Sequence, residues 1–188
     1  MKRCAWASSE ISIKYHDEEW GVPTQADQKL FEFLILEGAQ AGLNWEIILK
    51  KRAAYIQAFA EFDPAKVAAF DTDKLNELFN NSGIIRNRRK IAAAVENAKA
   101  FIKIQKEFGS FNHYIWRFVD GKPIQNHFQS ILNIPTETEL SRAISHDLKK
   151  RGMKFVGPTI IYSFMQAVGM VNDHLIDCFR FEEIFRMG

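Results

Sequence analysis

Apolar side chains recur along most of the chain at intervals of three or four residues, which is the spacing of one face of an α-helix. The longest helices predicted from this pattern cover residues 27–41, 44–59, 86–108 and 137–151. Shorter ones are predicted over 64–70, 72–81, 111–119, 158–168 and 172–185. No segment alternates apolar and polar residues as a half-buried strand does, and residues 121–135 look irregular. The pattern therefore predicts an all-α helical bundle.

Capping residues support several of these boundaries. Asp63 precedes Pro64, so proline would occupy the first helical position, where its missing N–H is not needed. Asn44 is placed to cap the helix that follows it, and Gly109 to end the long helix before it. Because no repeat, low-complexity tract or linker interrupts the chain, we expect residues 1–188 to form a single body.

Composition narrows the class of protein. With 188 residues and 47% hydrophobic content, the chain is long enough to bury a sizeable core. It has no run of about 18–20 apolar residues that could span a membrane, and residues 1–25 lack the features of a secretory signal. We therefore expect a cytoplasmic protein without a membrane partner.

The net charge of +2 is too small to indicate a nucleic-acid partner, but the basic residues are clustered. Three clusters lie near predicted helix ends, at residues 50–52, 86–90 and 149–154. Basic side chains at helix ends commonly complement the helix dipole in solvent. If the three clusters shared one face, they would instead form a phosphate-binding surface. The sequence leaves both interpretations open.

The third cluster lies in a hairpin between two predicted helices. Gly152 can adopt the positive φ that ends the first helix, and Gly157 precedes Pro158 at the start of the second. Free amide groups at that helix N-terminus suit a phosphate, and Lys154 adds positive charge beside them. The segment resembles a helix-hairpin-helix motif, which binds the DNA backbone irrespective of base sequence. A plain pair of helices joined by a glycine-capped turn has much the same pattern.

Glu37 stands in the most apolar of the predicted helices. An ionised carboxylate is costly to bury without a partner. Trp6, Tyr15, Trp20 and Trp45 come before and after it in the sequence. A carboxylate among aromatic rings suits a flat, positively charged, nitrogen-rich ligand, although aromatic residues at helical spacing are most often core. Glu37 is therefore either a paired core residue or the floor of a binding pocket.

Four residues near the two ends of the chain have the side chains of a zinc site. Cys4 and His16 lie near the start, and His174 and Cys178 lie near the end at a spacing of four residues, which would place both on one face of a helix. Two thiolates and two imidazoles match structural zinc chemistry. The spacing differs from that of a zinc finger, and a lone His-x-x-x-Cys is common by chance, so the residues alone favour free thiols and ordinary histidines over a zinc site.

Several ordered motifs together resemble the DNA-3-methyladenine glycosylase I (Tag) family of helix-hairpin-helix base-excision enzymes. The resemblance covers essentially the whole chain. It is carried by residues 3–6 (RCAW), 15–23 (YHDEEWGVP), 36–38 (LEG), 40–45 (QAGLNW), 62–64 (FDP), 83–86 (GIIR), 149–157 (KKRGMKFVG), 162–167 (YSFMQA) and 171–174 (VNDH).

The resemblance implies a role for each candidate residue. Cys4, His16, His174 and Cys178 would hold one structural Zn²⁺, joining the termini, approximately 1–20 and 171–188. Glu37 would contact the excised base, Tyr15 and Trp45 would stack on it, and Trp6, Trp20 and Ser163 would complete the pocket wall. Leu43 is the candidate for filling the gap left by a flipped nucleotide. Gly152, Lys154 and Gly157, within a helix-hairpin-helix unit of approximately 137–170, would contact the DNA backbone.

The activity implied by the family is hydrolysis of the N-glycosidic bond of 3-methyladenine in double-stranded alkylated DNA, with release of the base and an abasic site. No lysine is placed as an obvious nucleophile, so we expect a monofunctional enzyme without lyase activity, and a monomer by family expectation. Asp173 is expected to be structural or to support the zinc ligands. Asn44, where the family commonly has serine, and Ser12, where some members have tyrosine, leave the detailed pocket shape open.

Two other functions fit part of the pattern. A non-catalytic helix-hairpin-helix module would bind DNA without releasing bases. A small-molecule binder would use the aromatic pocket without DNA, so reversing the charges at residues 149–154 would not affect it.

Overall fold

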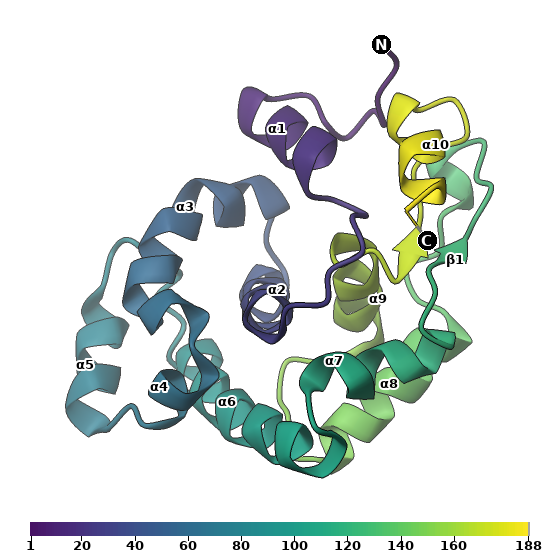
Figure 1. Cartoon of the computed structure of the whole chain (residues 1–188). Helices are drawn as coiled ribbons and strands as arrows, with labels where there is room; N and C mark the ends of the chain where they lie inside the picture. Colours follow the sequence, from purple (N-terminus) through teal and green to yellow (C-terminus); the bar gives the residue numbers. More distant parts are fainter. Residues whose placement is uncertain (188) are drawn as a thin grey trace.

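Helix α2, Asp27–Gln40, lies at the centre of the molecule with the other helices around it (Figure 1). All residues from Leu30 to Ala39 are buried, which explains why this helix is apolar on nearly every face. The computed structural model describes residues 1–187. Within them the all-α architecture predicted from the hydrophobic pattern is confirmed, apart from one pair of very short strands.

The helices before the midpoint of the chain are α1 (Glu10–Glu18), α2, α3 (Trp45–Ala58), α4 (Pro64–Ala68), α5 (Thr72–Asn80) and α6 (Arg88–Phe108). The later ones are α7 (Phe111–Trp116), α8 (Glu139–Lys150), α9 (Pro158–Ala167) and α10 (Phe179–Phe185). Single 3₁₀ turns η1, η2 and η3 occupy Ala60–Phe62, Arg117–Val119 and Ile131–Asn133. Strands β1 (Ile124–Gln125) and β2 (Val171–Asn172) pair in parallel.

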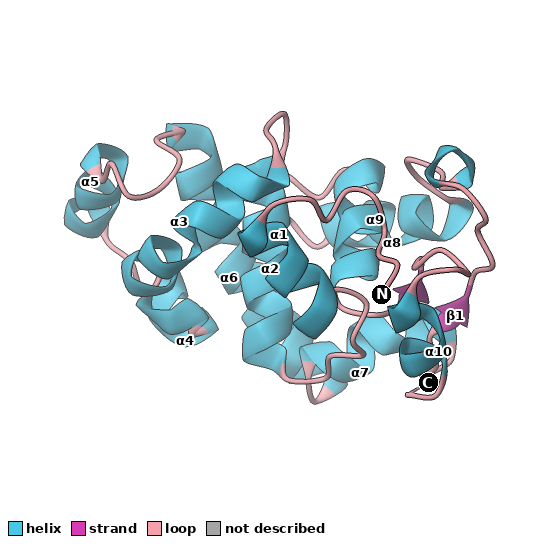
Figure 2. Cartoon of the chain, turned by 90° about the horizontal axis from the view of Figure 1, so that it is seen from above, coloured by secondary structure: helices cyan, strands magenta, loops and turns pink. Residues whose placement is uncertain are grey.

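The two termini lie on the same side of the molecule, next to α10 (Figures 1 and 2). The backbone N–H of Phe179 donates to the carbonyl of Lys2 at 3.0 Å, and this bond joins the ends directly. No described helix has the length and apolar character that a membrane crossing requires. The first and last segments therefore form one local structure, although more than 150 residues separate them in the sequence.

Two predictions about the ends of the chain are wrong. Residues 172–185 do not form one helix, because β2 and a series of turns occupy the segment up to Cys178, and only then does α10 begin. His174 and Cys178 therefore do not share a helix face. Helix α1 was not predicted, and its burial explains why: its buried positions are only Ser12, Tyr15 and His16, two of them polar. Residue 188, included in the predicted C-terminal segment, lies outside the described residues.

The predicted hairpin is present between α8 and α9. Gly152 adopts φ +92°, as a residue that ends a helix often does. Gly157 is the N-cap of α9 with φ −63°, so its place does not depend on a positive φ. Between them Phe155 has φ +55°, a left-handed conformation that residues with a side chain rarely adopt.

Candidate functional site

A single large pocket collects the aromatic residues predicted to act together. It is lined by all six residues proposed for base contact, namely Trp6, Tyr15, Trp20, Glu37, Trp45 and Ser163. The rings of Tyr15 and Trp45 lie 5.5 Å apart between centroids, and those of Trp6 and Trp20 lie 5.0 Å apart. Side chains from α1, α2, α3 and α9 thus converge on one volume.

Local structure places Trp45 in the pocket wall. Asn44 caps α3, and its side-chain oxygen accepts a hydrogen bond from the N–H of Glu46 at 2.8 Å. Trp45 is therefore the first residue of the helix, with its direction fixed by the cap. Its ring nitrogen Nε1 is buried and has no hydrogen-bond partner among the described residues. A buried donor without a partner is costly unless a ligand satisfies it.

Glu37 is buried and forms no ion pair or side-chain hydrogen bond with any described residue. Burial alone raises the pKa of its carboxyl group to about 8. Burial, followed by the nearby Glu37, likewise raises the pKa of Tyr15 well above its usual value. Of the two alternatives left by the sequence, the geometry matches the pocket, because Glu37 faces a volume shared with Tyr15 and Trp45.

The contrast with Glu32 shows how a paired carboxylate looks on the same helix. Glu32 Oε1 accepts from Arg52 Nε at 2.6 Å, and Lys29 Nζ lies 2.9 Å from its other oxygen. The other guanidinium nitrogens of Arg52 bind both oxygens of Glu19 at 2.7 Å. Arg52 is thus committed to Glu32 and Glu19, and Glu37 has no cation partner among the described residues.

The opposite wall of the pocket was not predicted as a whole. It comes from η3 and the segment after it, with Ile131, Ile134 and Pro135, and from α9, with Thr159, Tyr162 and Gln166. The η3 segment has no regular pattern, so its position depends on the tertiary fold. Ser12 also lines the pocket, at the position where the pocket wall was expected to be thin.

Asp173 supports this wall. It is buried, and its Oδ2 accepts hydrogen bonds from Tyr162 Oη at 2.6 Å and Gln166 Nε2 at 2.8 Å. Its Oδ1 accepts from Asn126 Nδ2 at 2.7 Å. Two of the three donors, Tyr162 and Gln166, line the pocket, so Asp173 holds side chains of the pocket wall in place.

The predicted zinc ligands lie together at the joined termini. One ligand atom each from Cys4, His16 and Cys178 falls within 4.8 Å of the others, and all three residues are buried. His174 lies beside them, with its ring centroid 5.0 Å from that of His16. Its Nε2 is buried and has no hydrogen-bond partner among the described residues. The ligand atoms of three predicted residues thus converge, and His174 lies next to that group without being part of it.

Neighbouring side chains orient both histidines, a feature not predicted from the sequence. His16 Nδ1 lies 2.8 Å from Asp17 Oδ1, and His174 Nδ1 lies 3.2 Å from Asn172 Oδ1. Such contacts favour the proton on Nδ1 and leave the lone pair on Nε2, and Nε2 of His16 lies 3.4 Å from Cys178 Sγ. Gly21, with φ +81°, is required here, because a Cβ atom at this position would lie 2.7 Å from His174 Cε1.

The remaining predicted residues lie outside the pocket. Leu43 is exposed on the loop between α2 and α3, and Lys154 is exposed in the hairpin between Gly152 and Gly157. This arrangement suits contacts with a large partner, but it does not by itself assign one.

Comparison with known proteins gives a consistent result. Residues 6–181 match the model of a protein family described as methyladenine glycosylase. A DNA-3-methyladenine glycosylase of Haemophilus influenzae is 49% identical over 177 residues, covering 94% of this chain and 96% of the relative.

Two solved structures are similar in fold. A crystal structure of 3-methyladenine DNA glycosylase I superposes with a TM-score of 0.92 at 49% identity, covering 95% of this chain and 98% of that chain. A tyrosine-to-phenylalanine variant of such an enzyme, in complex with 3-methyladenine, has a TM-score of 0.92 at 36% identity, with 95% and 96% coverage.

Proposed function

The chain belongs to the methyladenine glycosylase family, and from this membership we propose that it removes 3-methyladenine from alkylated double-stranded DNA by hydrolysing the N-glycosidic bond. The free base and an abasic site are the products. The names of the similar proteins and the complex of one of them with 3-methyladenine support this substrate.

The observation that carries the proposal is the buried carboxylate of Glu37, which has no cation partner among the described residues and lines the same pocket as Tyr15 and Trp45. Methylation at N3 makes the adenine cationic, and aromatic faces attract a cation by about 0.5–2 kcal/mol each when desolvated. Tyr15 and Trp45 would stack on the base, with Trp6, Trp20 and Ser163 completing the wall. A cation beside Glu37 favours its ionised form. An unmethylated, neutral adenine would not supply that charge, so the pocket selects the damaged base.

Hydrogen bonding adds a second level of selection. Glu37 would accept from the exocyclic amine of adenine, whereas the carbonyl that guanine carries at this position would face a carboxylate. The unpaired Nε1 of Trp45 would donate to a ring nitrogen of the base. Because methylation has already weakened the glycosidic bond, binding and charge placement would supply most of the catalysis.

The enzyme is proposed to be monofunctional. A lyase would need an amine able to form a Schiff base with the sugar. No lysine is among the described residues that line the pocket. Water would therefore attack the sugar, with DNA phosphates stabilising the developing positive charge.

The DNA would be held from two sides of the pocket. The base must leave the duplex, at a cost of a few kcal/mol, before it can enter the pocket. Leu43 would fill the gap that it leaves. Gly152, Lys154 and Gly157 would bind the backbone, with the amides at the start of α9 contacting a phosphate. The whole chain would act as one glycosylase body and as a monomer.

The cluster at the termini is proposed to hold one Zn²⁺. The donor set fits, because Cys4, His16 and Cys178 already converge and His174 Nε2 is buried without a partner. Zinc bound by four protein ligands would join the termini and keep no open position for water. Its contribution would be structural, and catalysis would remain with the residues of the pocket.

One assay tests the activity against both alternatives. The protein is incubated with methylated duplex DNA, and released bases are identified by chromatography. We expect 3-methyladenine to appear well above its spontaneous rate. DNA binding without release would favour a non-catalytic module. Free 3-methyladenine binding that survives Lys154→Glu, with no release from DNA, would favour a small-molecule binder. Either result would overturn the proposed function.

A further inference from the structure

The hairpin between α8 and α9 is held by a buried amide of α6. Asn97 is 4% exposed, and its Oδ1 accepts from the N–H of Lys154 at 2.8 Å. Its Nδ2 donates to the carbonyl of the same residue at 2.9 Å. The side chain therefore pairs with both backbone groups of one hairpin residue, as a neighbouring strand would. A buried polar group is costly unless bonded, and here both of its ends are bonded by the hairpin.

Contacts on the other side of the hairpin limit its movement further. Ser145 Oγ of α8 donates to the carbonyl of Val156 at 2.6 Å. Gly38 of α2 faces Phe155, and a Cβ atom added to Gly38 would lie 3.4 Å from that residue. Phe155 also holds its left-handed backbone conformation here, and such a conformation persists only where the surroundings determine it. The hairpin thus rests on the residue next to Glu37.

A second side chain of α6 holds the loop between α2 and α3. Lys90 Nζ donates to the carbonyls of Ala39 and Ala41 at 2.9 Å and 2.6 Å. These carbonyls belong to the C-terminal end of α2, which has no basic residue of its own in its last turn. A positive charge is favourable at the C-terminal end of a helix, where the last carbonyl oxygens lack hydrogen-bond partners within the helix. Lys90 therefore fixes the point from which the loop to Leu43 and Trp45 departs.

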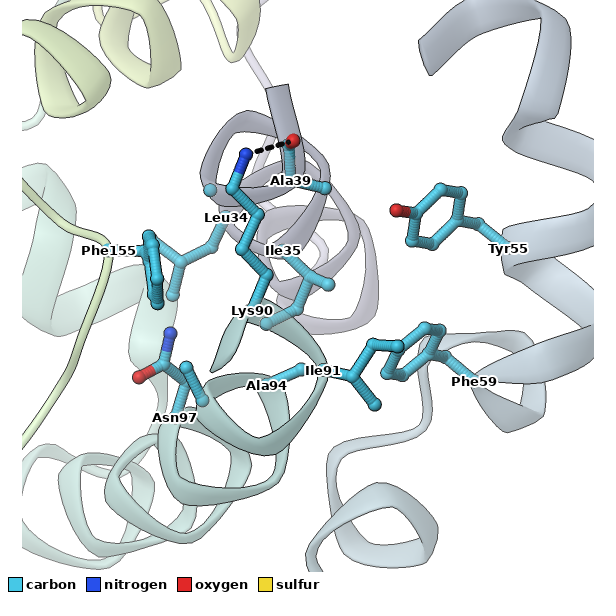
Figure 3. Close-up of a pocket in the computed structure, with 12 residues that line it drawn as sticks. Leu34, Ile35, Ala39, Tyr55, Phe59, Lys90, Ile91, Ala94, Asn97 and Phe155 are labelled. Atoms are coloured by element: carbon cyan, nitrogen blue, oxygen red, sulfur yellow. Dashed lines mark hydrogen bonds between the residues drawn. The ribbon is translucent and has the colours of Figure 1, made fainter. Parts of the chain in front are cut away.

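Lys90 and Asn97 are seven residues apart, which is about two helical turns, so they project from the same face of α6. Figure 3 shows Lys90 reaching Ala39 while Asn97 lies beside Phe155. One rigid helix therefore holds both segments that the function proposed above assigns to DNA. The Glu37 pocket is lined by residues of the α2–α3 loop, Asn44 among them, and by Thr159 and Ser163 of α9, the helix that follows the hairpin.

We propose that Lys90 and Asn97 are positioning residues that hold the hairpin and the α2–α3 loop at a fixed separation, so that a nucleotide extruded between them enters the Glu37 pocket. The proposal rests on the function proposed above. Neither residue would touch the base or the reacting sugar. Their loss would therefore affect steps that involve duplex DNA and spare binding of the free base.

The test compares Asn97→Leu, Asn97→Asp and Lys90→Met with Ile104→Val. Ile104 is a fully buried residue of α6, and its substitution lowers stability without touching either segment. For Asn97→Leu we expect KM for duplex DNA to rise about tenfold, because the hairpin contributes to binding before the base is extruded. Asn97→Asp keeps the acceptor for the N–H of Lys154, so its KM should lie between those of wild type and Asn97→Leu. The Kd for free 3-methyladenine should stay within about twofold for each.

For Lys90→Met we expect kcat to fall about tenfold with a smaller change in KM, because the loop acts when the nucleotide leaves the stack. The defect should shrink when the damaged base lies opposite an abasic site, where extrusion costs less. The Ile104→Val enzyme should behave alike on both substrates.

Three results would overturn the proposal. The variants could lose DNA excision and free-base binding equally, or Lys90→Met could show the same defect whether or not the damaged base lies opposite an abasic site. The third is that the variants lose no more activity than Ile104→Val does for the same loss of melting temperature. In each case the wild type still releases 3-methyladenine, so the proposed function stands. A wild-type protein that releases none would overturn both.

Discussion

The aromatic pocket and the cysteine–histidine cluster at the termini arrange their buried polar groups in opposite ways. In the cluster, the ligand atoms of Cys4, His16 and Cys178 point at one another and lie within 4.8 Å. In the pocket, Glu37 and Trp45 line a shared volume, and neither the carboxylate nor the ring Nε1 has a hydrogen-bond partner among the described residues. The first arrangement suits an ion that stays after folding, and the second suits a ligand that arrives and leaves.

Helix α1 joins the two regions, because adjacent residues serve different ones. Tyr15 lines the pocket, while His16 lies in the cluster. Trp6 and Trp20 contact both sides, with the ring of Trp20 4.5 Å from that of His174. The comparison therefore predicts that changes in the cluster reduce stability, and that changes in the pocket reduce activity, even between neighbouring residues.

The largest expected effect is on stability, from Cys178→Ala. Losing one of the four proposed zinc ligands should bring the metal content well below one per chain and remove several kcal/mol, which for this length lowers the melting temperature by about 10 °C. Metal analysis and thermal unfolding measure both. At a temperature where the variant is folded, its excision rate should approach that of wild type. An unchanged melting temperature, or a wild-type sample without zinc, would contradict the proposed metal site.

Glu37→Gln should instead reduce activity and leave the protein folded. Removing one partner of a buried charge pair costs about 3–5 kcal/mol, so excision of 3-methyladenine should fall by on the order of 100-fold or more. DNA binding should change little, because the hairpin is intact. Rates and DNA affinity are measured side by side. Equal loss of both would indicate a damaged fold and remove Glu37 from its proposed role.

The pH dependence of the free energy of unfolding tests whether the buried carboxyl of Glu37 lacks a partner. The folded pKa of Glu37 is raised from 4.5 to about 8 by burial, so below pH 4.5 the carboxyl is protonated in both states and costs nothing. Between the two values the unfolded chain ionises first, and stability falls by up to about 1.4 kcal/mol per pH unit. Urea unfolding at pH 5, 6.5 and 8 should therefore show Glu37→Gln gaining stability relative to wild type. A constant difference across this range would mean that Glu37 has a partner.

The sequence predicted correctly those helix ends that depend on capping residues close by in the chain. Asn44 and Asp63 cap their helices as side-chain acceptors, and Gly109 ends α6 with φ +84°. Where tertiary contacts decide, the pattern failed. Residues 172–178 contain enough apolar residues for a helix, but β2 pairs with β1 and the turns after it bring His174 to the cluster.

The candidate site was predictable in part for the same reason. Glu37 was conspicuous because a carboxylate conflicts with an apolar helix, and the aromatic residues were identified through whole-chain motifs. Asp17 and Asn172, which orient the histidines, lie inside two of these motifs but were assigned no role, and Lys90 and Asn97 on α6 lie outside every motif. Each is an ordinary polar residue in the sequence, and its contact appears only when distant segments pack.

The smallest expected effect decides which region Asp173 serves. It adjoins His174 in the chain, yet its carboxylate accepts from Tyr162 and Gln166 of the pocket wall. Asp173→Asn would set an amide donor against existing donors, which costs about 1–3 kcal/mol. We expect affinity for free 3-methyladenine to weaken by about tenfold, with zinc content unchanged.

Asp177→Asn is the matched control, because Asp177 is equally near the cluster in sequence but pairs with Lys2 at the surface. Asp177→Asn should alter neither the affinity for free 3-methyladenine nor the zinc content. If Asp173→Asn lost zinc and kept its affinity for the base, Asp173 would belong to the cluster. Asp173 would then serve the same region as its neighbour in the chain, His174. If Asp173→Asn instead weakened base binding and kept its zinc, the hydrogen bonds of Asp173, and not its position next to His174, would decide that it belongs to the pocket.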